Sequence, residues 1–225
     1  VSESQRSFNT FDFGPKISLT LPGLFPFPAR MLSKRQMPNT IISMLYNYQK
    51  RTDFERHLIQ LDYSWRWKTG KKQTFNGNIL NPIKFSLINP SDQFQEKLDN
   101  LNDLFTKNAY SSQFTWEDIR VSHVFDNQKS NLEEGKKNFF YNRLVLNHAG
   151  GMASLVTLNQ VPDSNNQKKI FKVPFAEFVK IENETKFYQN FSKKQSLNYR
   201  VHLGLGVPYG NSSAAMPFDY SFFAG

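Results

Sequence analysis

The side chains in this sequence that could do chemistry do not form a known catalytic or metal-binding motif. None of the four histidines has a partner at the His-x-x-x-His spacing that directs two imidazoles to one metal ion. They are His57, His123, His148 and His202. Cysteine is absent, which excludes thiolate metal sites, disulfides and cysteine nucleophiles together. We therefore expect no enzymatic activity, and no cofactor or metal.

One pair of carboxylates could act together. Glu182 and Glu184 lie two residues apart, so on a strand they would share one face, as a pair of glycosidase carboxylates can. Lys180 and Lys186 flank them, however, and alternating charges on one strand face form salt bridges. The spacing therefore predicts a ladder of salt bridges instead of a catalytic pair.

The elements that must position these side chains are β-strands. In the last segment, apolar Leu197, Tyr199, Val201, Leu203 and Leu205 alternate with Ser196, Asn198, Arg200, His202, Gly204 and Gly206. A period of two over this length is typical of a strand with one apolar and one polar face. Similar patterns near residues 11–21, 42–48, 58–68, 83–87, 119–125, 139–147 and 179–187 bring the total to about eight strands.

One segment departs from this alternation. Phe94, Leu98, Leu101 and Phe105 recur at the spacing of a helix, and Ser91 could cap its first turn. We expect one short amphipathic helix here, in a loop between strands.

Composition narrows the class of protein. The net charge is +9, from 28 basic and 19 acidic residues, but the lysines are scattered as pairs near predicted turns. No run approaches the roughly 20 apolar residues of a spanning helix. The predicted strands are longer than the five or six residues usual in soluble sheets, and tilted membrane strands need about nine to eleven. Their length and two-faced alternation favour an all-β, antiparallel transmembrane barrel of the outer-membrane type over a soluble β-sandwich.

The most distinctive motif is the segment that follows the last strand, Pro217-Phe218-Asp219-Tyr220-Ser221-Phe222-Phe223-Ala224-Gly225. Together with Tyr63-Ser64-Trp65-Arg66-Trp67, it resembles the outer-membrane protein assembly factors of the BamA and TamA type, in particular their TamA-like branch in Bacteroidetes. The resemblance implies that residues 1–225 are part of the C-terminal β-barrel (surface-antigen) domain. Upstream periplasmic repeats and the final strands of the barrel are then expected outside this chain, so the barrel is incomplete.

The resemblance also implies roles for particular residues. The segment would open an extracellular loop that folds back into the barrel, with phenylalanines as anchors and small residues allowing close backbone approach. The residues expected in this structural loop motif are Pro217, Phe218, Asp219, Phe222, Phe223, Ala224 and Gly225, with Gly210 and Asn211 at the strand exit. The residues expected to face the barrel lumen are Asn198, Arg200, His202, Gly204 and Gly206.

The implied function is the insertion or translocation of other outer-membrane proteins in a Gram-negative bacterium, with client strands pairing at a seam of the barrel. The implied partners are unfolded outer-membrane clients, the lipid bilayer and other subunits of an assembly complex, without nucleic acid. Two alternatives stay open within membranes, a two-partner secretion transporter and a porin. A third, from another class, is a soluble, basic β-rich binding module.

Overall fold

The computed structural model describes residues 10–28, 34–79, 83–192 and 195–222, and it confirms an all-β, antiparallel fold. The strands of the main sheet are β1 (Phe11–Phe13), β2 (Lys16–Pro22), β3 (Asn39–Lys50), β4 (Phe54–Gly70), β5 (Gln73–Ile79), β6 (Ile83–Pro90), β7 (Gln113–Asp126), β8 (Phe139–Ala149), β11 (Phe178–Ser192) and β12 (Gln195–Pro208). A separate hairpin consists of β9 (Lys169–Ile170) and β10 (Val173–Pro174). The helices are α1 (Asp92–Asn100), α2 (Leu104–Ala109), α3 (Gln128–Glu133) and α4 (Gly151–Val156), with the 3-10 turns η1 (Lys34–Gln36), η2 (Gly210–Ser212) and η3 (Phe218–Tyr220).

The main sheet is an antiparallel meander in which strands follow one another in chain order. The order of neighbouring strands is β1-β3-β4-β5-β7-β8-β11-β12. β2 follows β1 and also pairs with β3. β6 follows β5 and also lies between β4 and β7, paired with both. The eight strand positions agree with the prediction of about eight strands, although β5 was not predicted from the alternation. Within the described part of the chain, β12 pairs with β11 alone, and β1 and β2 pair with β3 alone, so the sheet has two open edges.

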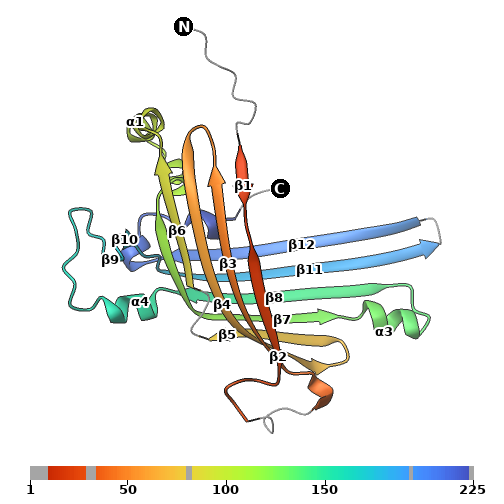
Figure 1. The fold of residues 1–225 in the computed structure, drawn as a ribbon. Helices are drawn as coiled ribbons and strands as arrows, with labels where there is room; N and C mark the ends of the chain where they lie inside the picture. The colour runs from red at the N-terminus through yellow and green to blue at the C-terminus, as the bar shows by residue number, and fades with distance from the viewer. Residues whose placement is uncertain (1–9, 29–33, 80–82, 193–194, 223–225) are drawn as a thin grey trace.

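The sheet is strongly twisted, and its two longest connections, residues 91–112 and 150–177, lie at the same end. Figure 1 shows β11 and β12 running across the view while β3 and β4 run almost upright. We call the end that carries α1, α4, the β9–β10 hairpin and η2 the tail end (Figure 1). The connections there include residues 91–112, 150–177 and 209–222, whereas β4 and β5 join at the opposite end through residues 71–72.

The register places apolar and polar side chains on opposite faces of the sheet. Leu205 pairs with Ile181, Ile181 with Leu146, and Leu146 with Val121, so these four residues lie on one face. We call this side the apolar face. Its exposed members include Ile17, Leu19, Ile42, Met44, Ile59, Leu61, Ile119, Leu144, Leu146, Ile181, Leu197, Tyr199, Val201, Leu203, Leu205 and Val207. The other side, the polar face, carries Lys180, Glu182, Arg200 and His202.

Little of the described chain is buried in a conventional core. One small cluster, Phe114, Ala153, Val173 and Phe175, joins α4 and the β9–β10 hairpin to the sheet. A second cluster, Ala149, Ala176 and Phe178, packs against Met216 and Tyr220. No helix in the described residues is long and apolar enough to span a membrane.

A short helix, α1, is present where the spacing predicts one, but the expectation of a single helix is wrong. The predicted segment divides into α1 and α2, because Leu101 adopts an extended conformation and Asp103 caps a new helix by accepting from the backbone N–H groups of Phe105 and Thr106. Ser91 occupies the N-cap position of α1, but its side chain makes no capping hydrogen bond. The described residues also form α3 and α4, which are too short to show a helical period in the sequence.

Candidate functional site

The segment after β12, residues 209–222, turns back onto the polar face of the sheet, and we call it the tail. The ring of Phe222 lies against Gly204, and the Met216 side chain lies against Gly206, where an added Cβ would come within 2.9 Å of the methionine. Both glycines therefore leave room for a tail side chain. The tail is seated on the face opposite Leu203 and Leu205.

The other predicted polar-face residues of β12 lie on the same face, and of these His202 contacts the tail. Arg200 Nε lies 2.8 Å from Glu184 Oε1, and the Lys186 ammonium lies 3.1 Å from the same carboxylate oxygen. Lys180 Nζ is 2.5 Å from Glu182, so the predicted ladder of salt bridges is present. The ring of His202 meets Phe222 edge-on at 6.2 Å, and Asn198 pairs with Tyr188 on β11.

Asp219 is the main ionic contact between the tail and the sheet. Its carboxylate lies 3.0 Å from the Arg56 guanidinium and also binds the Lys84 ammonium. Partial burial opposes ionisation of this carboxyl, but the charges and hydrogen bonds of Lys84 and Arg56 outweigh it and lower its pKa below the ordinary value of 3.8. Asp219 is therefore an anion that joins the tail to β4 and β6.

Tyr220 makes the main buried polar contact of the tail. Its hydroxyl donates to Glu117 Oε1 at 2.5 Å, and its ring packs on Phe178 with the centroids 4.6 Å apart. Burial and the neighbouring Glu117 carboxylate raise the pKa of Tyr220 well above 10.0. The tyrosine therefore acts here as a neutral hydrogen-bond donor.

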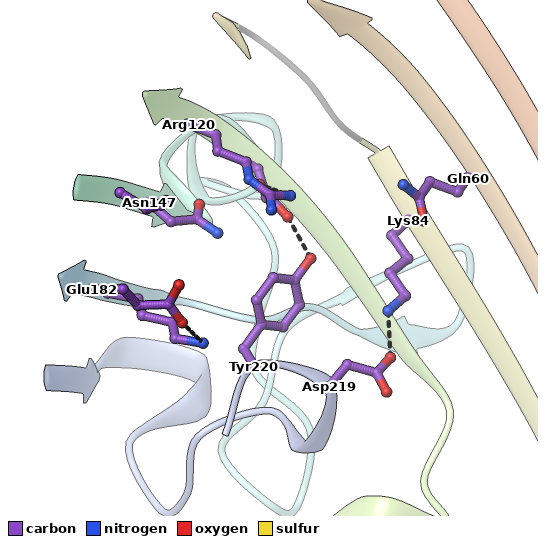
Figure 2. Close-up of a pocket in the computed structure, with 10 residues that line it drawn as sticks. Gln60, Lys84, Arg120, Asn147, Glu182, Asp219 and Tyr220 are labelled. Atoms are coloured by element: carbon purple, nitrogen blue, oxygen red, sulfur yellow. Dashed lines mark hydrogen bonds and ion pairs between the residues drawn. The ribbon is translucent and has the colours of Figure 1, made fainter. Parts of the chain in front are cut away.

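A cavity of about 210 Å³ lies between the tail and the polar face. Figure 2 shows Asp219 and Tyr220 on its tail side, facing polar residues of the sheet. The sheet residues in its lining are Gln60, Lys84, Glu117, Arg120, Val145, Asn147, Lys180 and Glu182.

Two oxygen atoms of this lining, Glu117 Oε2 and Asn147 Oδ1, are buried and accept no hydrogen bond from the described residues. Glu117 is only 1% exposed, and its Oε2 lies 3.7 Å from the Arg120 guanidinium. The cavity can therefore hold small polar groups that donate hydrogen bonds. No group of three or more His, Asp or Glu residues in the described ranges could hold a metal ion.

Gly210 and Asn211 lie at the exit of β12, around the buried carboxylate of Glu177. Gly210 has a φ of +49°, and a Cβ there would overlap the Glu177 carboxylate. The Asn211 backbone N–H donates to the same carboxylate, and the Asn211 side chain donates to the carbonyl oxygens of Lys168 at 2.8 Å and Phe175 at 2.9 Å. These two residues thus tie the start of the tail to residues 168–177.

His148 lies between Asp118 and Tyr209 in a series of polar contacts near the start of the tail. Asp118 Oδ2 is 3.0 Å from His148 Nδ1, and the Tyr209 hydroxyl is 2.8 Å from His148 Nε2. The order carboxylate, imidazole, hydroxyl is that of a nucleophile relay. Here, however, the Tyr209 hydroxyl also donates to the Ala149 carbonyl, and Asp118 accepts the backbone N–H groups that begin α4. We infer that this series of hydrogen bonds holds the loop after β8 against the tail.

The structure brings most of the predicted loop residues together. Pro217 is fully buried, Phe218 packs on Phe105 of α2 at 5.3 Å, and Asp219 and Phe222 reach the sheet as described. Phe223, Ala224 and Gly225 lie outside the described residues.

Several residues of the site were not predicted from the sequence. Glu177 interrupts an apolar run, Phe175-Ala176-Glu177-Phe178-Val179, and a lone acid in such a run indicates a satisfied buried charge. Glu117 and Asp118 break the strand alternation as two consecutive acids, at the point where the β7–β8 register shifts. No local sequence pattern indicated that Arg56 and Lys84 would belong to the site.

No protein family model, curated protein or solved structure matches this chain.

Proposed function

We propose that this chain is part of an outer-membrane β-barrel that helps other outer-membrane proteins to fold and insert. The observation that carries the membrane assignment is the exposed apolar face of the sheet. Leu203 and Leu205 are 65% and 63% exposed, and the described residues place no second layer over them. A soluble protein rarely leaves so large a contiguous apolar surface in water, whereas lipid would cover it favourably.

The polar face supports the same proposal. Charged side chains on a lipid-facing surface would cost about 2 to 4 kcal/mol each near the bilayer centre. Here the charges of β11 and β12 lie opposite the leucines and pair with one another. We therefore assign the polar face to a hydrated lumen and the tail to a plug inside it.

The assembly role rests on two further features. The tail sequence resembles that of the assembly factors, and the contacts of Phe222 and Met216 with the polar face of β12 support assigning the tail to a loop folded into the barrel. The free edge formed by β1 and β2 offers unpaired backbone groups, which a client strand could bind by adding to the sheet, whereas β12 would pair with the final strands expected outside this chain. No cofactor or nucleotide is needed for that exchange of hydrogen bonds.

The test of this role uses the intact protein, extracted with detergent and reconstituted in lipid vesicles. A urea-unfolded outer-membrane barrel is added as client, and its folding is followed by heat-modifiable migration on gels. We expect faster folding than in vesicles that contain an equal amount of an unrelated porin. Equal rates would leave a transporter or porin as the better assignment, and release of the protein from membranes by salt alone would favour a soluble basic module.

A further inference from the structure

The loop between β8 and β11, residues 150–177, presents large apolar side chains to its surroundings, and we call this loop the finger. It comprises α4 and the β9–β10 hairpin. Five of its apolar side chains are between 60% and 85% exposed: Leu155, Val156, Leu158, Val161 and Phe171. Loops of a water-facing end are expected to be polar, so this concentration calls for a physical explanation.

The finger is held in place and does not merely collapse on the sheet. The backbone N–H of Gly150 donates to the Trp116 carbonyl at 3.0 Å, and that of Ala176 donates to the Phe114 carbonyl at 2.8 Å. Asp118 fixes the start of α4, and the buried Val173 and Phe175 side chains pack on Phe114. The exposed side chains are therefore presented from a fixed base.

The finger packs against the apolar face on β6 and β7. The Phe171 ring meets the Phe85 ring edge-on, with the centroids 6.4 Å apart. Phe85 pairs with Ile59, a member of the apolar face, so Phe171 lies on that side of the sheet and adds to its exposed apolar surface. Figure 1 shows the β9–β10 hairpin and α4 at this end of the sheet.

The charges of the finger fit an anionic surface. Lys168, Lys169 and Lys172 flank the hairpin tip, whereas the exposed part of the finger carries one acid, Asp163, which pairs with Lys169 at 2.7 Å. Long lysine side chains can lie along an apolar layer and place their ammonium groups among lipid phosphates. Apolar side chains beside lysines are the composition of segments that lie in the membrane interface.

From these observations we propose that the finger inserts into the interface of an anionic lipid leaflet at the tail end of the barrel. Leu155, Leu158 and Phe171 enter the headgroup–acyl boundary, and Lys168 and Lys172 bind lipid phosphates. The finger thereby fixes the height of the tail end relative to the bilayer. This inference rests on the proposed membrane location of the sheet.

The test uses single-cysteine variants, which are convenient because residues 1–225 contain no cysteine. Phe171→Cys and Leu158→Cys report on the finger, Asn165→Cys is the matched control on its exposed polar loop, and Leu203→Cys reports on the apolar face. Each variant of the intact protein carries an environment-sensitive nitrobenzoxadiazole label in vesicles that contain anionic lipid. Quenching is measured with spin labels attached to lipids near the headgroup or deep in the acyl chain.

We expect the labels at positions 171 and 158 to be quenched at least about twofold more than the label at 165, and more by the shallow spin label than by the deep one. Quenching at 203 without quenching at 171 and 158 would overturn the finger proposal and leave the proposed function intact. No quenching at any position would overturn both. A blue-shifted label at 171 that lipid spin labels do not reach would identify a protein partner instead, and would also overturn the proposal.

The contribution of charge is tested separately in vesicles of neutral lipid and with Lys168→Gln/Lys172→Gln. We expect quenching at 171 to fall in both cases relative to the natural lysines with anionic lipid. Equal quenching in all three conditions would overturn the assignment of these lysines to lipid phosphates.

Discussion

The ring of Phe222 lies against Gly204 so closely that a methyl group at position 204 would overlap the ring. Because the obstructing atoms belong to a side chain of the tail, Gly204→Ala should displace the tail and leave the sheet intact. We expect a loss of about 1 to 3 kcal/mol in the free energy of seating the tail. Faster protease cleavage within residues 209–222 would measure this loss.

The matched control for this change is Gly70→Ala, since nothing lies within 4 Å of a Cβ at position 70. Its cleavage rate should equal that of the natural protein. If Gly204→Ala were cleaved no faster than Gly70→Ala, the seat of Phe222 on β12 would be wrong.

Removing the charge of Asp219 should loosen the tail as well. Asp219→Asn keeps the size of the side chain but loses two ionic partners, Arg56 and Lys84, which are themselves less than one quarter exposed. Hydrogen bonds to charged groups contribute about 1.5 to 3 kcal/mol, so a loss in this range is expected in denaturant unfolding.

The control for Asp219→Asn is Glu134→Gln. Glu134 pairs with Lys136 at 2.6 Å in an exposed loop, where solvent screens the ion pair and its loss should change stability little. Equal effects of the two substitutions would contradict the role given to Asp219.

Because the pKa of Asp219 is lowered in the folded protein, the stability that this residue contributes should depend on pH. The folded pKa of Asp219 lies below 3.8, so the unfolded chain binds a proton first as the pH falls. The stability that Asp219 contributes is complete above the unfolded pKa and is lost as the pH falls through the folded pKa. The difference in stability between the natural protein and Asp219→Asn should therefore be constant at neutral pH and shrink below about pH 4. A difference that grows with acidification would contradict this sign.

Tyr220 and Glu117 should be energetically coupled. Tyr220→Phe leaves Glu117 Oε1 without its donor in a buried position, which costs about 1 to 3 kcal/mol. In a Glu117→Leu background the same tyrosine substitution should have a smaller effect, because there is no acceptor left to satisfy. A double-mutant cycle in denaturant unfolding measures the difference. If the effects of the two substitutions on stability were additive, the hydrogen bond between Tyr220 and Glu117 would contribute nothing to holding the tail on the sheet.

The strands could be predicted because each repeats one simple pattern over many residues. Leu197 to Leu205 alternate strictly with polar residues, and the structure places the two sets on opposite faces. The helices were harder, since α4 has six residues and the break at Leu101 depends on Asp103 capping the next helix. Short local hydrogen bonds of this kind leave little trace in a period of apolar residues.

The tail site could be predicted only in part. The motif around Asp219 pointed to a structural loop, but its partners Arg56 and Lys84 lie 163 and 135 residues away in sequence. Such pairs depend on strand register and on where the tail folds back, and no local spacing encodes them. Glu177 was recognisable in principle, because it is a single acid in an apolar run.

We propose that the two faces of β12 meet different solvents, and spin labels placed one at a time along residues 197 to 203, outside the contacts of the tail with Gly204 and Gly206, test this most directly. In the reconstituted protein, labels at the odd positions, such as Leu203, should collide mainly with oxygen dissolved in lipid. Labels at the even positions, such as Arg200, should collide mainly with a water-soluble nickel chelate, so that accessibility alternates with a period of two. Equal access of the chelate to both sets of positions would contradict the membrane assignment.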